Sequence, residues 1–130
     1  MEGFPDYETV EYHVIYGALI DAARYQGTVT YQNLATLVGL PTVGSHMANR
    51  LGYLLGAISA NEINQGRPML SAVAVNAQGR VSDGFFVLAR QLGLLSDSAT
   101  RDEELKFLSE HRNASYDVWK QTYFQPKKSK

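Results

Sequence analysis

Few side chains in this chain can carry out chemistry. Cysteine is absent, which excludes disulfides, thiolate metal sites and thiol nucleophiles. The histidines His13, His46 and His111 lie far apart, and no spacing motif supplies the carboxylates that a metal site built from them would need. Ser71 stands in an apolar run, but no histidine base lies near it in the sequence. These observations predict a non-enzymatic protein without a metal ion or other cofactor.

A second group of polar residues indicates binding. One face of a predicted helix carries hydrogen-bonding and stacking side chains at helical spacing: His46, Asn49, Arg50 and Tyr53. Asparagine reads adenine edges and arginine reads guanine edges in the major groove of DNA. The same pattern is also typical of the solvated face of an amphipathic helix, so both interpretations stay open at this point.

The charge is unevenly distributed, although the net charge is only −1. Residues 1–21 carry five acidic and no basic side chains, and the first lysine is Lys106, so every cation in the middle of the chain is an arginine. Guanidinium groups suit bidentate contacts with phosphate and guanine. Nucleic-acid-binding domains are often far more basic. Charge alone therefore does not decide between a nucleic-acid partner and a protein partner.

The elements that position these residues are predicted to be mostly helices. Apolar spacing predicts helices over residues 7–25 and 31–38, with Thr30 as the N-cap of the second. Ser45 is the predicted N-cap of a third helix that reaches about residue 64. Ala35, with Gly39 four residues later, suits the crossing and turn of a helix-turn-helix. The third helix buries an apolar face formed by Met47, Leu51, Leu54, Leu55 and Ile58.

The remainder of the chain predicts a hairpin and further helices. The apolar run 69–75, the turn 76–79 and the short strand 80–82 indicate a β-hairpin. Asp83 is the predicted N-cap of a helix over 84–92, and two more helices are expected over 101–112 and 115–124. This order predicts a mainly α (α+β) fold, a winged helix-turn-helix with a small β-hairpin and extra C-terminal helices. We expect a single domain over residues 1–125 and a basic tail over 126–130.

Two further features bear on partners and location. The last predicted helix carries an aromatic cluster, which either packs into the core or faces a partner: Tyr116, Trp119, Tyr123 and Phe124. The N-terminus lacks the cationic and apolar regions of a signal peptide, and no apolar stretch approaches eighteen residues. We therefore expect a cytoplasmic protein that does not cross a membrane.

Three stretches within residues 28–93 carry motifs of a known family. They are Val29-Thr30-Tyr31-Gln32-Asn33-Leu34-Ala35, Gly39-Leu40-Pro41 followed by Asn49-Arg50-Leu51-Gly52-Tyr53-Leu54-Leu55, and the segment from Leu70 to Arg80. Together they resemble the DNA-binding domain of alkylguanine-DNA alkyltransferases and the alkyltransferase-like proteins. The resemblance implies a winged-helix scaffold that binds duplex DNA, with Tyr31 as a phosphate contact.

The chain departs from this family at the reactive positions. Ser71 aligns with the alkyl-accepting cysteine, and Ala72 and Val73 replace the neighbouring histidine and arginine. Because a serine hydroxyl without an activating base is a poor acceptor, alkyl transfer is excluded. Asn49 aligns with the arginine that fills the gap left by a flipped nucleotide, and Arg50 is one residue away.

We expect a non-catalytic protein that binds double-stranded DNA, with a role in DNA repair, damage recognition or regulation. The predicted DNA contacts are Thr30, Tyr31, Gln32, Ser45, His46, Asn49, Arg50, Tyr53, Arg67, Gln78 and Arg80. The alternative is a protein-interaction module or regulatory subunit in which the winged helix is only a scaffold. A homodimer or a protein partner through the C-terminal helices fits either interpretation.

Overall fold

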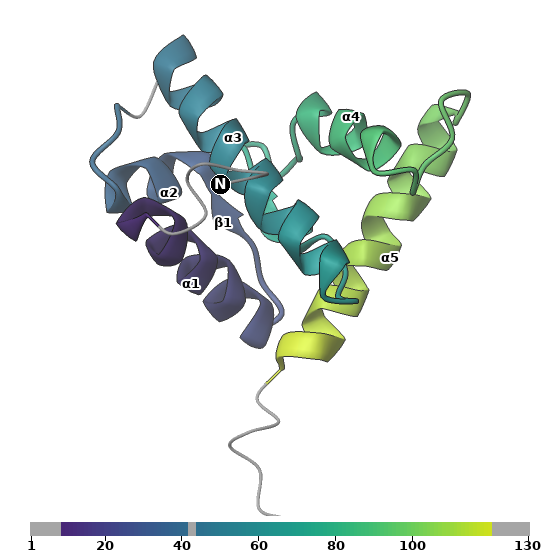
Figure 1. Cartoon of the computed structure of the whole chain (residues 1–130), viewed down its shortest axis with the longest axis horizontal. Helices are drawn as coiled ribbons and strands as arrows, with labels where there is room; N and C mark the ends of the chain where they lie inside the picture. The colour runs from purple at the N-terminus through teal and green to yellow at the C-terminus, as the bar shows by residue number, and fades with distance from the viewer. Residues whose placement is uncertain (1–8, 42–43, 121–130) are drawn as a thin grey trace, which may run out of the picture.

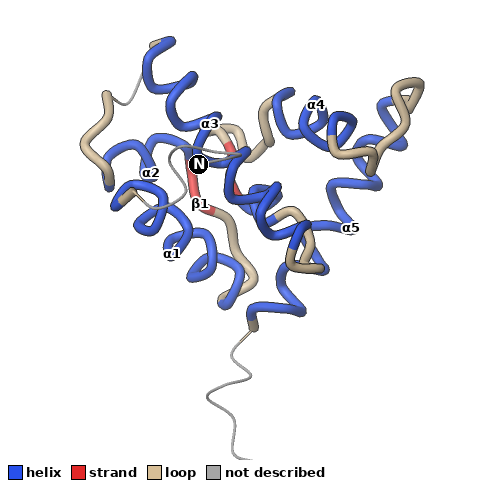
Figure 2. The backbone as a smooth tube through the Cα atoms, viewed as in Figure 1, coloured by secondary structure: helices blue, strands red, loops and turns tan. Residues whose placement is uncertain are grey.

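The computed structural model describes residues 9–41 and 44–120, and this part of the chain is mainly helical (Figures 1 and 2). Its α-helices are α1 (Val10–Arg24), α2 (Tyr31–Leu37), α3 (Ser45–Asn64), α4 (Asp83–Gln91) and α5 (Arg101–Trp119). Short elements complete it: the strands β1 (Val29–Thr30) and β2 (Ala74–Val75) and the 3-10 helix η1 (Leu70–Val73). The predicted fold class, mainly helical with a small sheet, is confirmed. Within these ranges no helix combines the length and apolarity needed to cross a bilayer.

The two strands form a parallel pair in which Val29 lies opposite Ala74 and Thr30 opposite Val75. The predicted hairpin over 69–82 is therefore wrong. Residues 69–75 are buried throughout, and the first part of this run is the 3-10 helix. Strands buried on both faces are typical of parallel pairing in the interior. The partner of β2 is thus β1, which precedes α3, rather than the chain that follows the turn.

The turn at 76–79 does form as predicted. The side-chain oxygen of Asn76 accepts hydrogen bonds from the backbone N–H groups of Gln78 and Arg80, at 2.9 and 3.1 Å. Gly79 has a φ of 82°, a conformation that favours glycine. After the turn, the N–H of Ser82 donates to the Tyr31 hydroxyl at 2.8 Å, and α4 begins at the next residue. Residues 80–82 form no strand in the structure.

Of the three predicted N-caps, one is confirmed and two are wrong. Thr30 is the N-cap of α2, as predicted, and its hydroxyl accepts a backbone N–H at 3.1 Å. Ser45 is the first residue of α3 rather than its N-cap, since Gly44 occupies that position with a φ of 95°. Asp83 is likewise the first residue of α4, and Ser82 is the N-cap. Both corrections shift the boundary by one residue.

The prediction of two C-terminal helices is also wrong, because α5 is continuous from Arg101 to Trp119. It begins with a capping box in which Thr100 and Glu103 bond each other's backbone N–H groups. Asn113 lies where the break was expected. An asparagine costs a helix less than about 1 kcal/mol, and buried contacts of Ser115 and its neighbours hold this part of α5 in place. The predicted residues 121–124 lie outside the described part of the chain.

The core forms around α3, with α1 and α2 on one side and α4 and α5 on the other (Figure 1). The predicted apolar face of α3 is confirmed, since all five of its residues are buried: Met47, Leu51, Leu54, Leu55 and Ile58. In α1, however, Val10 and Val14 follow the helical spacing but are 78% and 37% exposed. Tyr116 and Trp119 of α5 pack against the core cluster, which supports the core interpretation for these two. Tyr123 and Phe124 lie outside the described residues.

Candidate functional site

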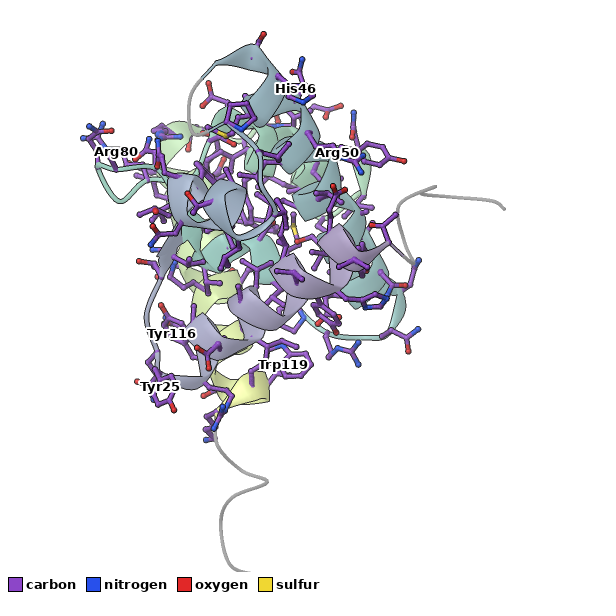
Figure 3. All side chains as sticks on the ribbon, turned by 90° about the vertical axis from the view of Figure 1, so that its left-hand side faces the viewer. Tyr25, His46, Arg50, Arg80, Tyr116 and Trp119 are labelled. Atoms are coloured by element: carbon purple, nitrogen blue, oxygen red, sulfur yellow. The ribbon has the colours of Figure 1, made fainter. Side chains whose placement is uncertain are left out.

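The N-terminal half of α3 presents a polar face to solvent. Because the apolar face of this helix is buried, the side chains on the opposite face point outward. His46 and Asn49 are exposed, and Tyr53 is 36% exposed. His46 lies at one extreme end of the molecule (Figure 3). Buried packing thus fixes the orientation of the helix, while its polar face stays open for binding.

Arg50, the predicted cation on this helix, is held by α1. Its Nη2 atom lies 2.6 Å from Glu11 Oε1, with the side chains 29% and 40% exposed, respectively. No local sequence pattern indicates this pair, because its residues are 39 positions apart on different helices. The Arg50 guanidinium is therefore near the polar face but already has an anionic partner.

The turn after β2 brings a second cation to the same end of the molecule. Gln78 and Arg80 are exposed, and Figure 3 shows Arg80 at the end where His46 lies. The Arg80 guanidinium makes no ion pair with another residue among those described. It is therefore a cation whose charge faces solvent.

The predicted contacts at the start of α2 are occupied within the fold. The Thr30 hydroxyl caps α2, and the Tyr31 hydroxyl accepts the N–H of Ser82 at 2.8 Å. Gln32 is half-buried, and its backbone carbonyl accepts a hydrogen bond from the Thr36 hydroxyl at 3.0 Å. Tyr31 thus connects α2 with the start of α4, whereas the hydrogen bonds of Thr30 and Gln32 lie within α2 and its N-cap.

Arg67 does not join the other predicted contacts. Its Nε and Nη2 donate to both carboxylate oxygens of Glu62, at 2.9 and 2.8 Å, and its guanidinium lies 5.5 Å from the centre of the Trp119 ring. Figure 3 shows Trp119 at the end of the molecule opposite His46. Arg67, predicted as a contact to the DNA backbone, therefore lies beside Trp119 and away from His46 and Arg80.

The partners of Arg67 form a buried polar cluster that joins three helices. Glu62 is completely buried, and its Oε2 accepts the Tyr16 hydroxyl at 2.6 Å. Burial and this hydrogen bond to the carboxylate raise the pKa of Tyr16 to about 12. The hydrogen bonds to Glu62 likewise raise the pKa of Arg67. We define Tyr16, Glu62, Arg67 and Trp119 as the Glu62 cluster, which connects α1, α3 and α5.

A cleft of about 260 Å³ opens between α3 and α4. Its lining includes Tyr31, Tyr53, Gly56, Ser71, Val87 and Leu88. A smaller adjoining hollow of about 120 Å³ shares Tyr31 with it. Sequence reasoning missed this cleft, because its walls come from two helices whose crossing no local pattern specifies. Gly52 and Gly56 were the available signal, since they leave the α3 side of the cleft without bulky side chains.

Ser71 contributes to the wall of the cleft, but it lacks a catalytic base. It is 7% exposed, and its hydroxyl accepts from the Ser59 hydroxyl at 2.7 Å. Its backbone N–H donates to the same Ser59 oxygen at 3.0 Å. Within the described residues no histidine bonds Ser71, and the Nδ1 of His111 instead accepts from the Met69 N–H at 3.0 Å. The Ser71 hydroxyl is thus held by Ser59 within the wall of the cleft.

The histidines are likewise dispersed in the part of the chain that the structure describes. His13 and His46 are exposed on α1 and α3, and His111 is partly buried on α5. No three His, Asp or Glu side chains in residues 9–41 and 44–120 gather closely enough to share a metal ion.

Comparisons with protein-family models, curated proteins and solved structures give no match to this chain. Its function must therefore be argued from the residues and their geometry.

Proposed function

We propose that the chain is a non-catalytic protein that binds double-stranded DNA, with α2 and α3 as a helix-turn-helix and α3 as the helix that enters a groove. The exposed polar face of α3 carries this proposal. His46, Asn49 and Tyr53 project from a helix whose other face is firmly packed. The major groove of B-DNA admits an α-helix, and an asparagine amide pairs well with an adenine edge.

The surroundings of α3 supply contacts to the DNA backbone. The N-cap of α3 is Gly44, which has no side chain to satisfy the first N–H groups, and such helix N-termini suit phosphate. Ser45 begins this helix and is exposed. Arg80, at the same end of the molecule as His46 in Figure 3, is exposed just after the turn at 76–79, and Gln78 is exposed on the turn itself. We assign base contacts to Asn49 and phosphate contacts to Ser45 and Arg80.

The resemblance to alkyltransferase-like proteins supports the same proposal. Ser71 stands at the position of the family's acceptor cysteine, and it lies in the wall of the cleft beside α3. Tyr31, at the position of the family's phosphate-contacting tyrosine, lines the same cleft. A role in recognising damaged DNA follows by this analogy and belongs to the proposal.

The test compares variants of the proposed contacts in titrations of a fluorescently labelled 20-base-pair duplex. Asn49→Ala should weaken binding about 5- to 150-fold, as expected for the loss of a base contact worth roughly 1–3 kcal/mol. Arg80→Gln should weaken binding to a similar extent on every duplex sequence, because it removes a phosphate contact. Lys106→Gln is the matched control for Arg80→Gln, because Lys106 is an exposed cation on α5. Its affinity should stay within twofold of the wild type.

Equal affinities for the wild type, Asn49→Ala and Arg80→Gln would contradict the proposed interface. Absence of any binding at low salt would contradict DNA binding itself. The protein-interaction alternative would then be the function to pursue.

A further inference from the structure

The ion pair between Glu11 and Arg50 ties the proposed DNA-binding face to α1. Arg50 lies three residues before Tyr53 and one after Asn49, so it belongs to the same part of α3. Glu11 lies in the first turn of α1, and its Oε1 is 2.6 Å from Arg50 Nη2. The guanidinium that is best placed to accompany Asn49 into a groove is thus neutralised by a carboxylate of the same chain.

The pair is open to exchange with an external anion. The Arg50 side chain is 29% exposed and the Glu11 side chain 40% exposed, so solvent reaches both groups. Ion pairs with this exposure contribute little to stability, and salt screens them. In contrast, the ion pair between Glu62 and Arg67 is held firmly. Glu62 is completely buried, and Arg67 donates to both of its carboxylate oxygens. Arg50 is therefore the α3 arginine that can change partners without disrupting the core.

A DNA phosphate is the natural replacement for the carboxylate. Both groups are anionic oxygen acceptors that match the fork of a guanidinium. Glu11 is also part of an acidic segment, since residues 1–21 carry five acidic and no basic side chains.

We propose that Glu11 is an autoinhibitory residue, which competes with DNA phosphate for Arg50 and so limits the affinity of the α3 face for DNA. This inference rests on the proposed function. It extends that function by assigning regulation to a residue on α1, outside the binding face. Neutralising Glu11 removes one anionic competitor for the Arg50 guanidinium.

The experiment measures duplex affinity for Glu11→Gln, in which a neutral amide replaces the charged carboxylate with little change in shape. Removing one negative charge at contact distance from Arg50 should tighten binding roughly fivefold in low salt. The plot of log affinity against log salt should also become steeper by about 0.9, because one more phosphate is neutralised. Asp117→Asn is the matched control. This variant makes the same change in net charge on an exposed residue near the Trp119 end of α5, and it should change affinity less than twofold.

A double-mutant cycle assigns the effect to Arg50. Arg50→Gln should weaken binding more in the Glu11→Gln background than in the wild type. Far-UV circular dichroism and thermal melting verify that the variants are folded, and Glu11→Ala provides a second neutral variant, which should also bind more tightly.

The outcomes separate this inference from the proposed function. If the wild type binds DNA but Glu11→Gln and Glu11→Ala bind no more tightly than Asp117→Asn, the autoinhibitory role is overturned and the binding function stands. If neither the wild type nor any variant binds at low salt, the proposed function is overturned and the inference with it.

Discussion

At the scale of single residues, the arginine on α3 and the arginine in the loop that follows it differ in how buried their carboxylate partners are. Arg50 pairs with a partly exposed carboxylate, whereas Arg67 pairs with the completely buried Glu62 and contacts the Trp119 ring. A buried carboxylate is stable only while a cation and hydrogen bonds compensate it. Arg67 is therefore a structural residue, although its type alone favoured a role in DNA binding.

Arg67→Gln tests this assignment. The substitution leaves the buried carboxylate of Glu62 with the Tyr16 hydroxyl as its remaining strong donor. We expect the free energy of unfolding to fall by about 2 kcal/mol, less than for a fully buried pair because Arg67 reaches solvent. Affinity for duplex DNA should remain unchanged under conditions where the variant is folded.

Urea denaturation combined with the duplex titration provides the measurement. Arg80→Gln is the control with the opposite pattern, since Arg80 is exposed and should affect affinity but leave stability within about 0.5 kcal/mol. A loss of DNA affinity in Arg67→Gln as large as that in Arg80→Gln would contradict the structural role.

At the scale of elements, local patterns predicted the helices well, and long-range pairing accounts for the failures. The start of α2 and the buried face of α3 follow from capping and spacing within a few residues. The pairing of β2 with β1 joins residues about 45 positions apart, and neither strand carries a local sign of its partner. The cleft between α3 and α4 and the Glu62 cluster were missed for the same reason. The site was thus predictable as a helix face but not as a set of tertiary contacts.

The docking of α5 on η1 depends on the protonation of one histidine. His111 Nδ1 accepts the N–H of Met69 at 3.0 Å, and the neighbouring Arg112 Nε donates to the Ala72 carbonyl at 2.8 Å. Only an unprotonated Nδ1 can accept a hydrogen bond. Burial lowers the pKa of His111 below its ordinary value of 6.5, and nearby Glu110 opposes this shift only in part.

The lowered pKa predicts a loss of stability in acid. Below about pH 6.5 the unfolded chain binds a proton at His111 that the folded protein binds less readily. The contribution of His111 to stability is therefore complete above pH 6.5, and it declines as the pH falls toward the lower pKa of the folded state. We expect the free energy of unfolding to fall between pH 7 and pH 5, with His111 as one contributor.

His111→Asn is the variant that tests this dependence, because asparagine retains an acceptor oxygen but does not titrate. Urea denaturation at several pH values should give a smaller decline for the variant than for the wild type. His13 and His46 are present in both proteins, so the comparison isolates the effect of His111. Identical pH profiles would show that His111 does not couple protonation to the docking of α5.

At the scale of the whole molecule, the two ends differ in the side chains that they hold. One end holds His46 and Arg80, and the other holds Trp119, next to which Arg67 and Glu62 are paired (Figure 3). The net charge of −1 does not favour DNA, so binding requires that exposed cations be concentrated at one end. Composition could not reveal this arrangement, because it depends on which arginines the fold pairs with carboxylates.

The most direct test of DNA binding is the salt dependence of affinity of the wild-type protein for a labelled 20-base-pair duplex. If the α3 face and Arg80 contact phosphates, affinity should fall steeply as salt rises from about 50 to 200 mM. The slope of log affinity against log salt should be steeper than about −0.9, which corresponds to more than one phosphate contact. No binding at 50 mM salt and tens of micromolar protein, or binding that salt does not change, would contradict the proposed function.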